Sequence, residues 1–379
     1  MSDPGEPEPF EIAVPDAVLD DLRERIAGVR WPEQPAEIGW EHGGDFAYLR
    51  ELCEHWRAAY DWRVVERALN GLSNWRWEGI HVIWERAPLD RRGVAVSERL
   101  PVALLHGWPG APIEFLDLIG ALVGAGHDVV VPSLPGFAFS AAPDPALDVA
   151  GMSVRLRALM RALGYERYAV QGGDWGSIIG ARMAFDDPVA VAALHLNAPG
   201  VLPLPADLAE PPMSEAELGY AQTAQRWRLR EGFHLLTQAA APDALAPGLH
   251  DSPAGLAAWL VDKYRRWSDC GGEVERRFSK DELCDLLTVY WATGTIASSM
   301  RLYAAEARNR WRLAAGERIE VPAAVADFPA ELVRPPREWV ERVLGDLRRW
   351  SAFDRGGHFA ALEEPELLGD DLLEFLSEV

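Results

Sequence analysis

Short apolar segments alternate with amphipathic segments between residues 101 and 196, and this alternation constrains the fold more than any other feature of the chain. In chain order the pattern predicts strands at 101–105 and 128–131, a helix at 152–163, a strand at 168–170, a helix at 178–185 and a strand at 191–196. Alternation of this kind predicts an α/β fold with a mostly parallel sheet and helices on both faces.

A long helical pattern interrupts the alternation after residue 204. Residues 205–310 are helical in pattern throughout, with prolines and glycines between the helices. Strand signals return at 319–326 and 350–353, before a final helix at 366–379. A helical block inserted between strands predicts a cap over the carboxyl ends of the strands, where such sheets bind their ligands.

The region before residue 99 has a pattern of its own. Helical spacing occurs at 17–30 and 49–62, and 80–84 is a candidate strand. We therefore expect an N-terminal helical extension, a first part of an α/β core, a cap and a second part of the core, at residues 1–98, 99–204, 205–310 and 311–379.

Composition narrows the class of protein. The 379 residues carry a formal net charge of −22, which argues against nucleic acid and an anionic membrane surface as partners. No stretch has the apolar length of a spanning helix, and the acidic, proline-rich start is not a signal peptide. Three cysteines (Cys53, Cys270 and Cys284) lie far apart and match no metal-ligand spacing. We expect a soluble cytoplasmic protein without a metal site.

The sharpest motif is GGDWGS at 172–177, between a buried strand and a helix. It has the glycine–x–nucleophile–x–glycine form of a nucleophile elbow, a sharp turn that leaves no room for a Cβ atom at either glycine. A lone motif of this form is more often a surface turn, but the flanking strand and helix favour the elbow. The nucleophile position holds Asp174.

An aspartate nucleophile indicates chemistry that differs from that of a serine hydrolase. With an ordinary pKa of about 3.9, Asp174 is ionised at neutral pH and needs no base to activate it. A carboxylate suits attack on saturated carbon, such as that of an epoxide or a carbon–halogen bond, and leaves an alkyl ester on the enzyme. Hydrolysis of the ester then needs a base-activated water and an oxyanion hole.

Candidates for the oxyanion hole and for the base follow predicted strands. Trp108, in HGWPG at 106–110, and Trp175 can each present a backbone N–H to the same oxyanion. Of the nine histidines, His358 lies on a loop after the last strand signal, where this architecture places its base.

The acid that orients the base should lie between nucleophile and base in the sequence. Asp327 and Glu331 both follow the predicted strand at 319–326, and the pattern leaves the choice between them open. Asp354 is too close to His358 along the chain to reach its ring easily, so we interpret it as a surface charge.

Several further motifs occur in a fixed order, and together they resemble one family. They are LRERI (22–26), RWP (30–32), YDWR (60–63), LN (69–70), HGWPG (106–110), PSLPG (132–136), GDWG (173–176), DSPAGL (251–256), YWATGT (290–295), FPAE (328–331) and RGGHFAA (355–361). Along nearly its whole length the chain resembles the microsomal-type epoxide hydrolases of the α/β-hydrolase superfamily.

This resemblance implies an enzyme that converts a small-molecule epoxide to a vicinal diol without a metal or organic cofactor. It implies Asp174 as nucleophile, His358 as base and Glu331, rather than Asp327, as acid. Mammalian members carry a membrane anchor, whereas this chain starts with an acidic segment, so we expect no membrane association. A homodimer is allowed by analogy with many hydrolases.

The family also uses two cap tyrosines that hydrogen-bond the epoxide oxygen. One falls on Tyr303. The other should follow a glycine, but Gly232 is followed by Phe233, and counting back from later residues of the cap places His234 at that position instead. We expect either that His234 or a water supplies the second donor, or that Phe233 is packing and Tyr303 suffices.

Two other functions stay open at this point. A dehalogenase would share the aspartate nucleophile, the elbow and the histidine, and it needs no alkoxide donor. The N-terminal third and Tyr303 argue against it. A non-catalytic ligand-binding homologue would be expected to lack a core catalytic residue, whereas Asp174, His358 and Glu331 are all present.

Overall fold

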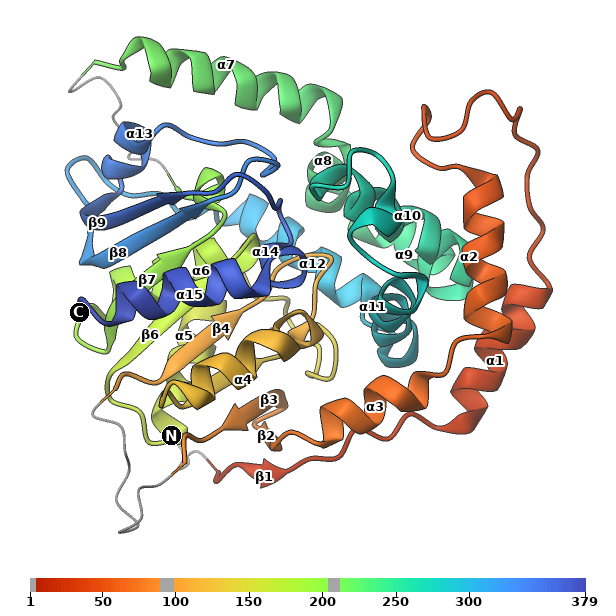
Figure 1. Cartoon of the computed structure of the whole chain (residues 1–379), viewed down its shortest axis with the longest axis horizontal. Helices are drawn as coiled ribbons and strands as arrows, with labels where there is room; N and C mark the ends of the chain where they lie inside the picture. Colours follow the sequence, from red (N-terminus) through yellow and green to blue (C-terminus); the bar gives the residue numbers. More distant parts are fainter. Residues whose placement is uncertain (1–4, 89–98, 204–211) are drawn as a thin grey trace.

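A mixed β-sheet forms the centre of the structure (Figure 1). The computed structural model describes residues 5–88, 99–203 and 212–379. Within these ranges nine strands form one sheet in the order β1-β2-β3-β5-β4-β6-β7-β8-β9. The strands are β1 (Glu8–Pro9), β2 (Asn74–Trp77), β3 (Ile80–Glu85), β4 (Val102–Leu105), β5 (Val129–Pro132), β6 (Tyr168–Gly172), β7 (Val191–Leu196), β8 (Ile319–Asp327) and β9 (Leu344–Ala352).

The sheet is parallel from β5 to β9 and antiparallel at its other edge. The prediction of a mostly parallel α/β sheet is confirmed. The antiparallel edge consists of β1, β2 and β3. The strand β3 covers the candidate strand at 80–84, and the N-terminal segment also contributes β1 and β2, which were not predicted. The two residues of β1 carry no apolar alternation, and β1 is recognisable through its pairing with β2. Similarly, β9 begins at Leu344, earlier than the strand predicted at 350–353. The first residues of β9 are largely polar, so the sequence pattern did not indicate a strand there.

Helices cover both faces of the sheet, as expected. The core helices are α4 (Leu116–Gly124), α5 (Val149–Ala162), α6 (Trp175–Asp186), α13 (Arg337–Glu341), α14 (Ala360–Glu363) and α15 (Pro365–Leu376). α4 packs against α15 and α5 packs against α6, and Figure 1 shows the two pairs on opposite faces. In the described ranges, no helix is both long and apolar enough to cross a bilayer.

A second group of helices lies between β7 and β8 in the sequence. It comprises α7 (Glu215–Arg230), α8 (Phe233–Ala240), α9 (Pro242–Asp251), α10 (Pro253–Trp267), α11 (Lys280–Thr293) and α12 (Ile296–Arg308). α8, α9 and α12 contact one another, and α10 contacts α9 and α11. The predicted domain boundary at 204–205 lies outside the described residues, and so does residue 98 at the first boundary. The division into four segments stays a prediction.

The N-terminal segment packs against this helical group. Its helices are α1 (Asp16–Ala27), α2 (Phe46–Ala58) and α3 (Trp62–Asn70), and α2 contacts both α10 and α11. The indole N–H of Trp56 donates to Oγ1 of Thr288 at 2.8 Å, and the hydroxyl of Tyr60 donates to Asp285 at 2.6 Å. One continuous segment therefore joins the edge of the sheet to the outer side of this helical group, α7–α12, which is called the cap below.

A sharp turn between β6 and α6 places Asp174 at the carboxyl end of the parallel strands. Its backbone has φ 48° and ψ −124°, a conformation that residues with side chains rarely adopt. A Cβ on Gly172 would lie 2.4 Å from the carbonyl oxygen of Gly176, and a Cβ on Gly176 would lie 1.9 Å from that of Leu105. Both positions therefore require glycine, as the elbow motif predicts.

We predict that Gly176→Ala destabilises the protein by about 3 kcal/mol, because the added methyl group meets backbone atoms that cannot move aside. Gly120→Ala is the matched control. Nothing lies within 4 Å of a Cβ at Gly120, which is inside α4, so alanine should stabilise the fold by about 0.5–1 kcal/mol. Urea unfolding followed by circular dichroism measures both. A Gly176→Ala protein as stable as the wild type would contradict this account of the turn.

Candidate active site

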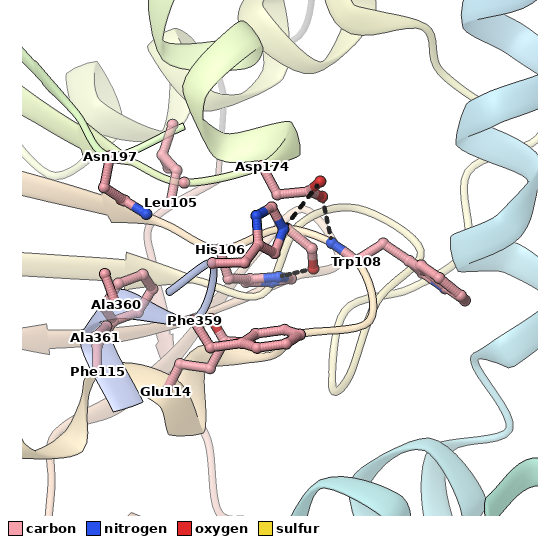
Figure 2. Close-up of a pocket in the computed structure, with 14 residues that line it drawn as sticks. Leu105, His106, Trp108, Glu114, Phe115, Asp174, Asn197, Phe359, Ala360 and Ala361 are labelled. Carbon is pink, nitrogen blue, oxygen red and sulfur yellow. Dashed lines mark hydrogen bonds and ion pairs between the residues drawn. The ribbon is translucent and has the colours of Figure 1, made fainter. Parts of the chain in front are cut away.

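Two backbone N–H groups contact the carboxylate of Asp174. That of Trp108 donates to Oδ1 at 2.7 Å, and that of Trp175 also hydrogen-bonds the carboxylate. Figure 2 shows Trp108 meeting the carboxylate from its own loop. Trp175 is the first residue of α6, so the positive end of a helix dipole also faces Asp174. The two backbone donors named from the sequence thus converge on this side chain.

The imidazole of His358 lies between two carboxylates. Its Nδ1 donates to both oxygens of Glu331, each at 2.9 Å, and its Nε2 lies 3.5 Å from Oδ2 of Asp174. A bridge between Ala330 and Gly357 joins the loop after β8 to the loop after β9. This bridge brings Glu331 and His358 together, and His358 is only 4% exposed.

The other carboxylates named from the sequence have different surroundings. Both oxygens of Asp327 accept hydrogen bonds from Arg334, at 2.7 and 2.6 Å. The side chain of Asp354 is 90% exposed and lies near Arg355 on the surface. Among these carboxylates, Glu331 is the one that hydrogen-bonds His358.

Burial and charge together set the protonation of the Asp174–His358 pair. Burial opposes ionisation of Asp174, but the hydrogen bond and charge of His358 and the two backbone N–H groups outweigh it, so the pKa of Asp174 is lowered. Burial also disfavours the charged form of His358. The charge and hydrogen bond of Glu331 and those of Asp174 outweigh this effect, so the pKa of His358 is raised well above its usual value. The resting pair is therefore a carboxylate beside an imidazolium.

Tyr303 extends from α12 over the two tryptophans. Its ring packs edge-on against Trp175, with centroids 4.7 Å apart, and against Trp108 at 5.9 Å. Burial raises the pKa of its phenol well above the usual value, so Tyr303 keeps its proton. The side chain lines the same cavity as Asp174.

The two residues at the position of the missing second tyrosine have opposite surroundings. His234 is 2% exposed, stacks on Trp108 with the ring planes 9° apart, and lines the cavity. Phe233 is 41% exposed and packs against Trp259. Burial and the charge of Lys263 lower the pKa of His234 to about 3, so its ring is neutral at neutral pH. Its Nδ1 has no hydrogen-bond partner among the described residues.

The cavity beside Asp174 has a volume of about 280 Å³. Tyr303 and His234 are among its polar residues on the cap side, together with Tyr220, Arg228 and Glu306. Much of the remaining wall is aromatic or aliphatic and includes Trp175, Trp227, Leu235, Trp267 and Leu332. A mainly apolar cavity with a few convergent polar groups is typical of a small-molecule site.

Two residues beside the site were not identified from the sequence. Trp267, at the end of α10, packs its ring against His234 at 4.8 Å and against His358 at 5.3 Å. Nothing in the pattern distinguishes it from the other 15 of the 16 tryptophans. Glu114 lies in the short 3₁₀ helix η1 (Pro112–Phe115), buried beside Asp174. Its sequence signal is one acidic residue within APIEF, directly after the HGWPG motif.

Known families and structures match almost the whole chain. A family described as epoxide hydrolase N terminus matches residues 7–115, and one described as alpha/beta hydrolase fold matches residues 101–266. Epoxide hydrolase 1 of Sus scrofa is 32% identical over 403 residues, which cover 97% of this chain and 88% of the relative.

Two solved structures support the same assignment. The crystal structure of juvenile hormone epoxide hydrolase from the silkworm Bombyx mori is 31% identical, with a TM-score of 0.86 over 99% of this chain and 94% of that one. The structure of Aspergillus niger epoxide hydrolase is 26% identical, with a TM-score of 0.83 over 100% of this chain and 98% of that one. The resemblance seen in the sequence motifs is confirmed: the chain belongs to the epoxide hydrolase family and has the α/β-hydrolase fold.

Proposed function

We propose that this enzyme converts a small-molecule epoxide to a vicinal diol through a covalent ester on Asp174. The main support is the ionised carboxylate of Asp174 in the wall of an apolar cavity that Tyr303 also lines. His358, hydrogen-bonded to Glu331, lies 3.5 Å from the same carboxylate. The relatives named as epoxide hydrolases support the same substrate class.

In the first step the carboxylate of Asp174 attacks an epoxide carbon, and the bond between that carbon and the ring oxygen breaks. The hydroxyl of Tyr303 donates to the ring oxygen and stabilises the developing alkoxide. His234 supplies a second donor in the tautomer that carries the ring proton on Nδ1. Donors placed where negative charge develops in a water-poor site lower the barrier more than they would in water.

In the second step a water molecule attacks the carboxyl carbon of the Asp174 ester while His358 takes its proton. The backbone N–H groups of Trp108 and Trp175 stabilise the oxyanion. Glu331 orients the imidazole of His358 and stabilises the imidazolium. Asp174, His358 and Glu331 therefore act as a catalytic triad. Collapse of the oxyanion breaks the ester bond and releases the diol. The ring alkoxide takes the proton that His358 carries in the resting enzyme, so the imidazole is neutral when the water attacks. Of the two protons of the water, one completes the second hydroxyl of the diol and the other restores the imidazolium. No step calls for a cofactor.

Ester formation itself prepares His358 to act as a base. In the resting enzyme the charge and the hydrogen bond of Asp174 are among the interactions that raise the pKa of His358. The ester carries no charge, so this contribution is lost and the pKa of His358 falls. The imidazole therefore releases its proton more readily after the epoxide has opened, which is when a base is needed.

A dehalogenase remains the competing assignment for the same nucleophile. Halide release needs no proton donor, whereas Tyr303 is buried, protonated and beside Asp174 in the same cavity. This placement favours epoxide opening. The retained Asp174, His358 and Glu331 argue in the same way against a protein that merely binds a ligand.

We also propose a cytoplasmic location. The cysteines of the chain (Cys53, Cys270 and Cys284) are free and buried, as expected in a reducing compartment. The homodimer suggested by analogy with other hydrolases stays a prediction.

Asp174→Ala should abolish turnover of styrene oxide, because the nucleophile is lost. His358→Gln should still open the epoxide and should then accumulate the covalent ester, detected by mass spectrometry of the intact protein. Asp327→Asn is the control, since Asp327 bonds Arg334 instead of His358, and it should turn over without accumulating ester. Turnover by Asp174→Ala together with no ester in His358→Gln would refute the mechanism.

Tyr303→Phe should slow epoxide opening by about 10²–10³-fold, because a donor to the developing alkoxide is lost. His234→Phe retains the ring that stacks on Trp108 but loses the N–H, and it should slow the same step by about 10-fold or more. Rapid-quench measurement of ester formation tests both variants, with Phe233→Leu as the neighbouring control expected to match the wild type. Unchanged turnover in His234→Phe and in His234→Ala would exclude His234 as a donor.

A further inference from the structure

The mechanism above leaves one buried carboxyl group beside the nucleophile without a role. Glu114 is 9% exposed, and its Oε1 has no hydrogen-bond partner among the described residues. A buried polar atom without a partner costs free energy, so a side chain of this kind needs an explanation.

A small cavity of about 20 Å³ lies next to this carboxyl group. Asp174, His358, Glu114 and Gly110 are among the residues that line it, and Figure 2 shows Asp174, Trp108 and Glu114 around it. Holding one water requires a volume of roughly 10–15 Å³ or more together with two to four polar partners. The cavity therefore has the size of a single-water site.

A second buried polar atom in this lining lacks a close partner. Nε2 of His358 makes only a long contact, 3.5 Å to Oδ2 of Asp174, and has no other hydrogen-bond partner among the described residues. One water in the cavity can bond both Nε2 of His358 and Oε1 of Glu114. The two atoms thus point to the same small polar ligand.

The loop after β4 leaves room for the carboxyl group of Glu114 beside the small cavity. A Cβ on residue 110 would lie 1.9 Å from Oε1 of Glu114, so Gly110 leaves the room that the carboxyl group occupies. The hydroxyls of Tyr264 and Tyr290 donate to the carbonyl oxygens of Pro109 and Gly110, each at 3.0 Å. The cap helices α10 and α11 therefore hold the loop that faces Glu114.

The protonation of Glu114 suits a hydrogen-bond donor. Burial raises its pKa to about 8, with the positive charge of His358 opposing and the negative charge of Asp174 adding to the shift. At neutral pH the carboxyl group is mostly protonated, so it can donate its O–H to a water oxygen without placing a further negative charge beside Asp174.

The small cavity and the substrate cavity share Asp174 in their walls. The substrate cavity includes Tyr303 and His234, whereas the small cavity includes Glu114 and His358. An alkyl group bound to Asp174 would occupy the first cavity and leave the second free. The attacking water can therefore be in place while the ester is still present.

We propose that Glu114 holds and orients the hydrolytic water in this small cavity; the inference rests on the function proposed above. The O–H of Glu114 donates to the water oxygen, and one O–H of the water donates to Nε2 of His358. The water oxygen then bonds to the carboxyl carbon of the Asp174 ester while its proton passes to His358. When the ester bond breaks, that proton goes to the departing alkoxide, which completes the diol. The other proton of the water passes from the carboxyl group of Asp174 to His358, and this restores the carboxylate and the imidazolium of the resting enzyme.

The test separates the two chemical steps with styrene oxide in rapid-quench experiments. Intact-protein mass spectrometry follows ester formation and ester loss in the wild type, Glu114→Leu, Glu114→Asp and Glu114→Gln. Glu114→Leu should form the ester at nearly the wild-type rate and hydrolyse it at least about 10-fold more slowly, because the water is no longer oriented. Glu114→Gln keeps an N–H donor and should recover most of the hydrolysis rate.

Two further variants keep the result interpretable. Glu66→Gln replaces another buried carboxyl group, in α3, that accepts hydrogen bonds from Val14 and Trp62, and it should leave both rates unchanged. Glu114→Asp withdraws the carboxyl group by one methylene and should also slow ester hydrolysis selectively, which tests the proposal even if Glu114→Leu does not fold.

Wild-type hydrolysis rates in Glu114→Leu or Glu114→Asp, or equal slowing of both steps, would overturn the role of Glu114. Failure of the wild type to form an ester would instead overturn the proposed function.

Discussion

The carboxylate of Asp174 depends on a turn that fixes both its position and its charge. Gly172 and Gly176 allow β6 to pass directly into α6, and the backbone N–H groups of Trp108 and Trp175 then meet the carboxylate at the carboxyl end of the sheet. In a largely apolar surrounding, these contacts and the neighbouring histidine keep the group ionised. The same two N–H groups are already in place for an oxyanion on the ester, so one arrangement can serve both halves of the proposed reaction.

The cap and the core surround Asp174 with different chemistry. Tyr303 and His234 line the larger, mainly apolar cavity, whereas His358 and Glu114 line the smaller one. The N-terminal segment contributes at a distance, because it packs against α10 and α11, whose tyrosines hold the loop after β4. Its β1, β2 and β3 also extend the sheet. The additions to the core thus support the site from outside.

Features that depend on neighbouring residues could be predicted from the sequence, and features that depend on distant contacts could not. The strand, glycines and helix around Asp174 are contiguous, so the turn was predictable. The choice between Asp327 and Glu331 depends on two contacts that the sequence pattern does not show. Arg334 binds Asp327, and the loop that carries Glu331 pairs with the loop that carries His358. Likewise, the backbone direction of α8 decides that His234 faces the cavity. Glu114 became recognisable only when the fold brought residues far apart in sequence around one small cavity.

A single turnover in water labelled with oxygen-18 tests the central claim most directly. With enzyme in excess over epoxide, the covalent mechanism transfers an unlabelled oxygen of Asp174 to the diol and places the labelled oxygen in the carboxylate. Mass spectrometry of the product and of the peptide that contains Asp174 should therefore find an unlabelled diol and a labelled aspartate. A labelled diol with an unlabelled aspartate would show direct attack of water on the epoxide and would contradict the covalent role of Asp174.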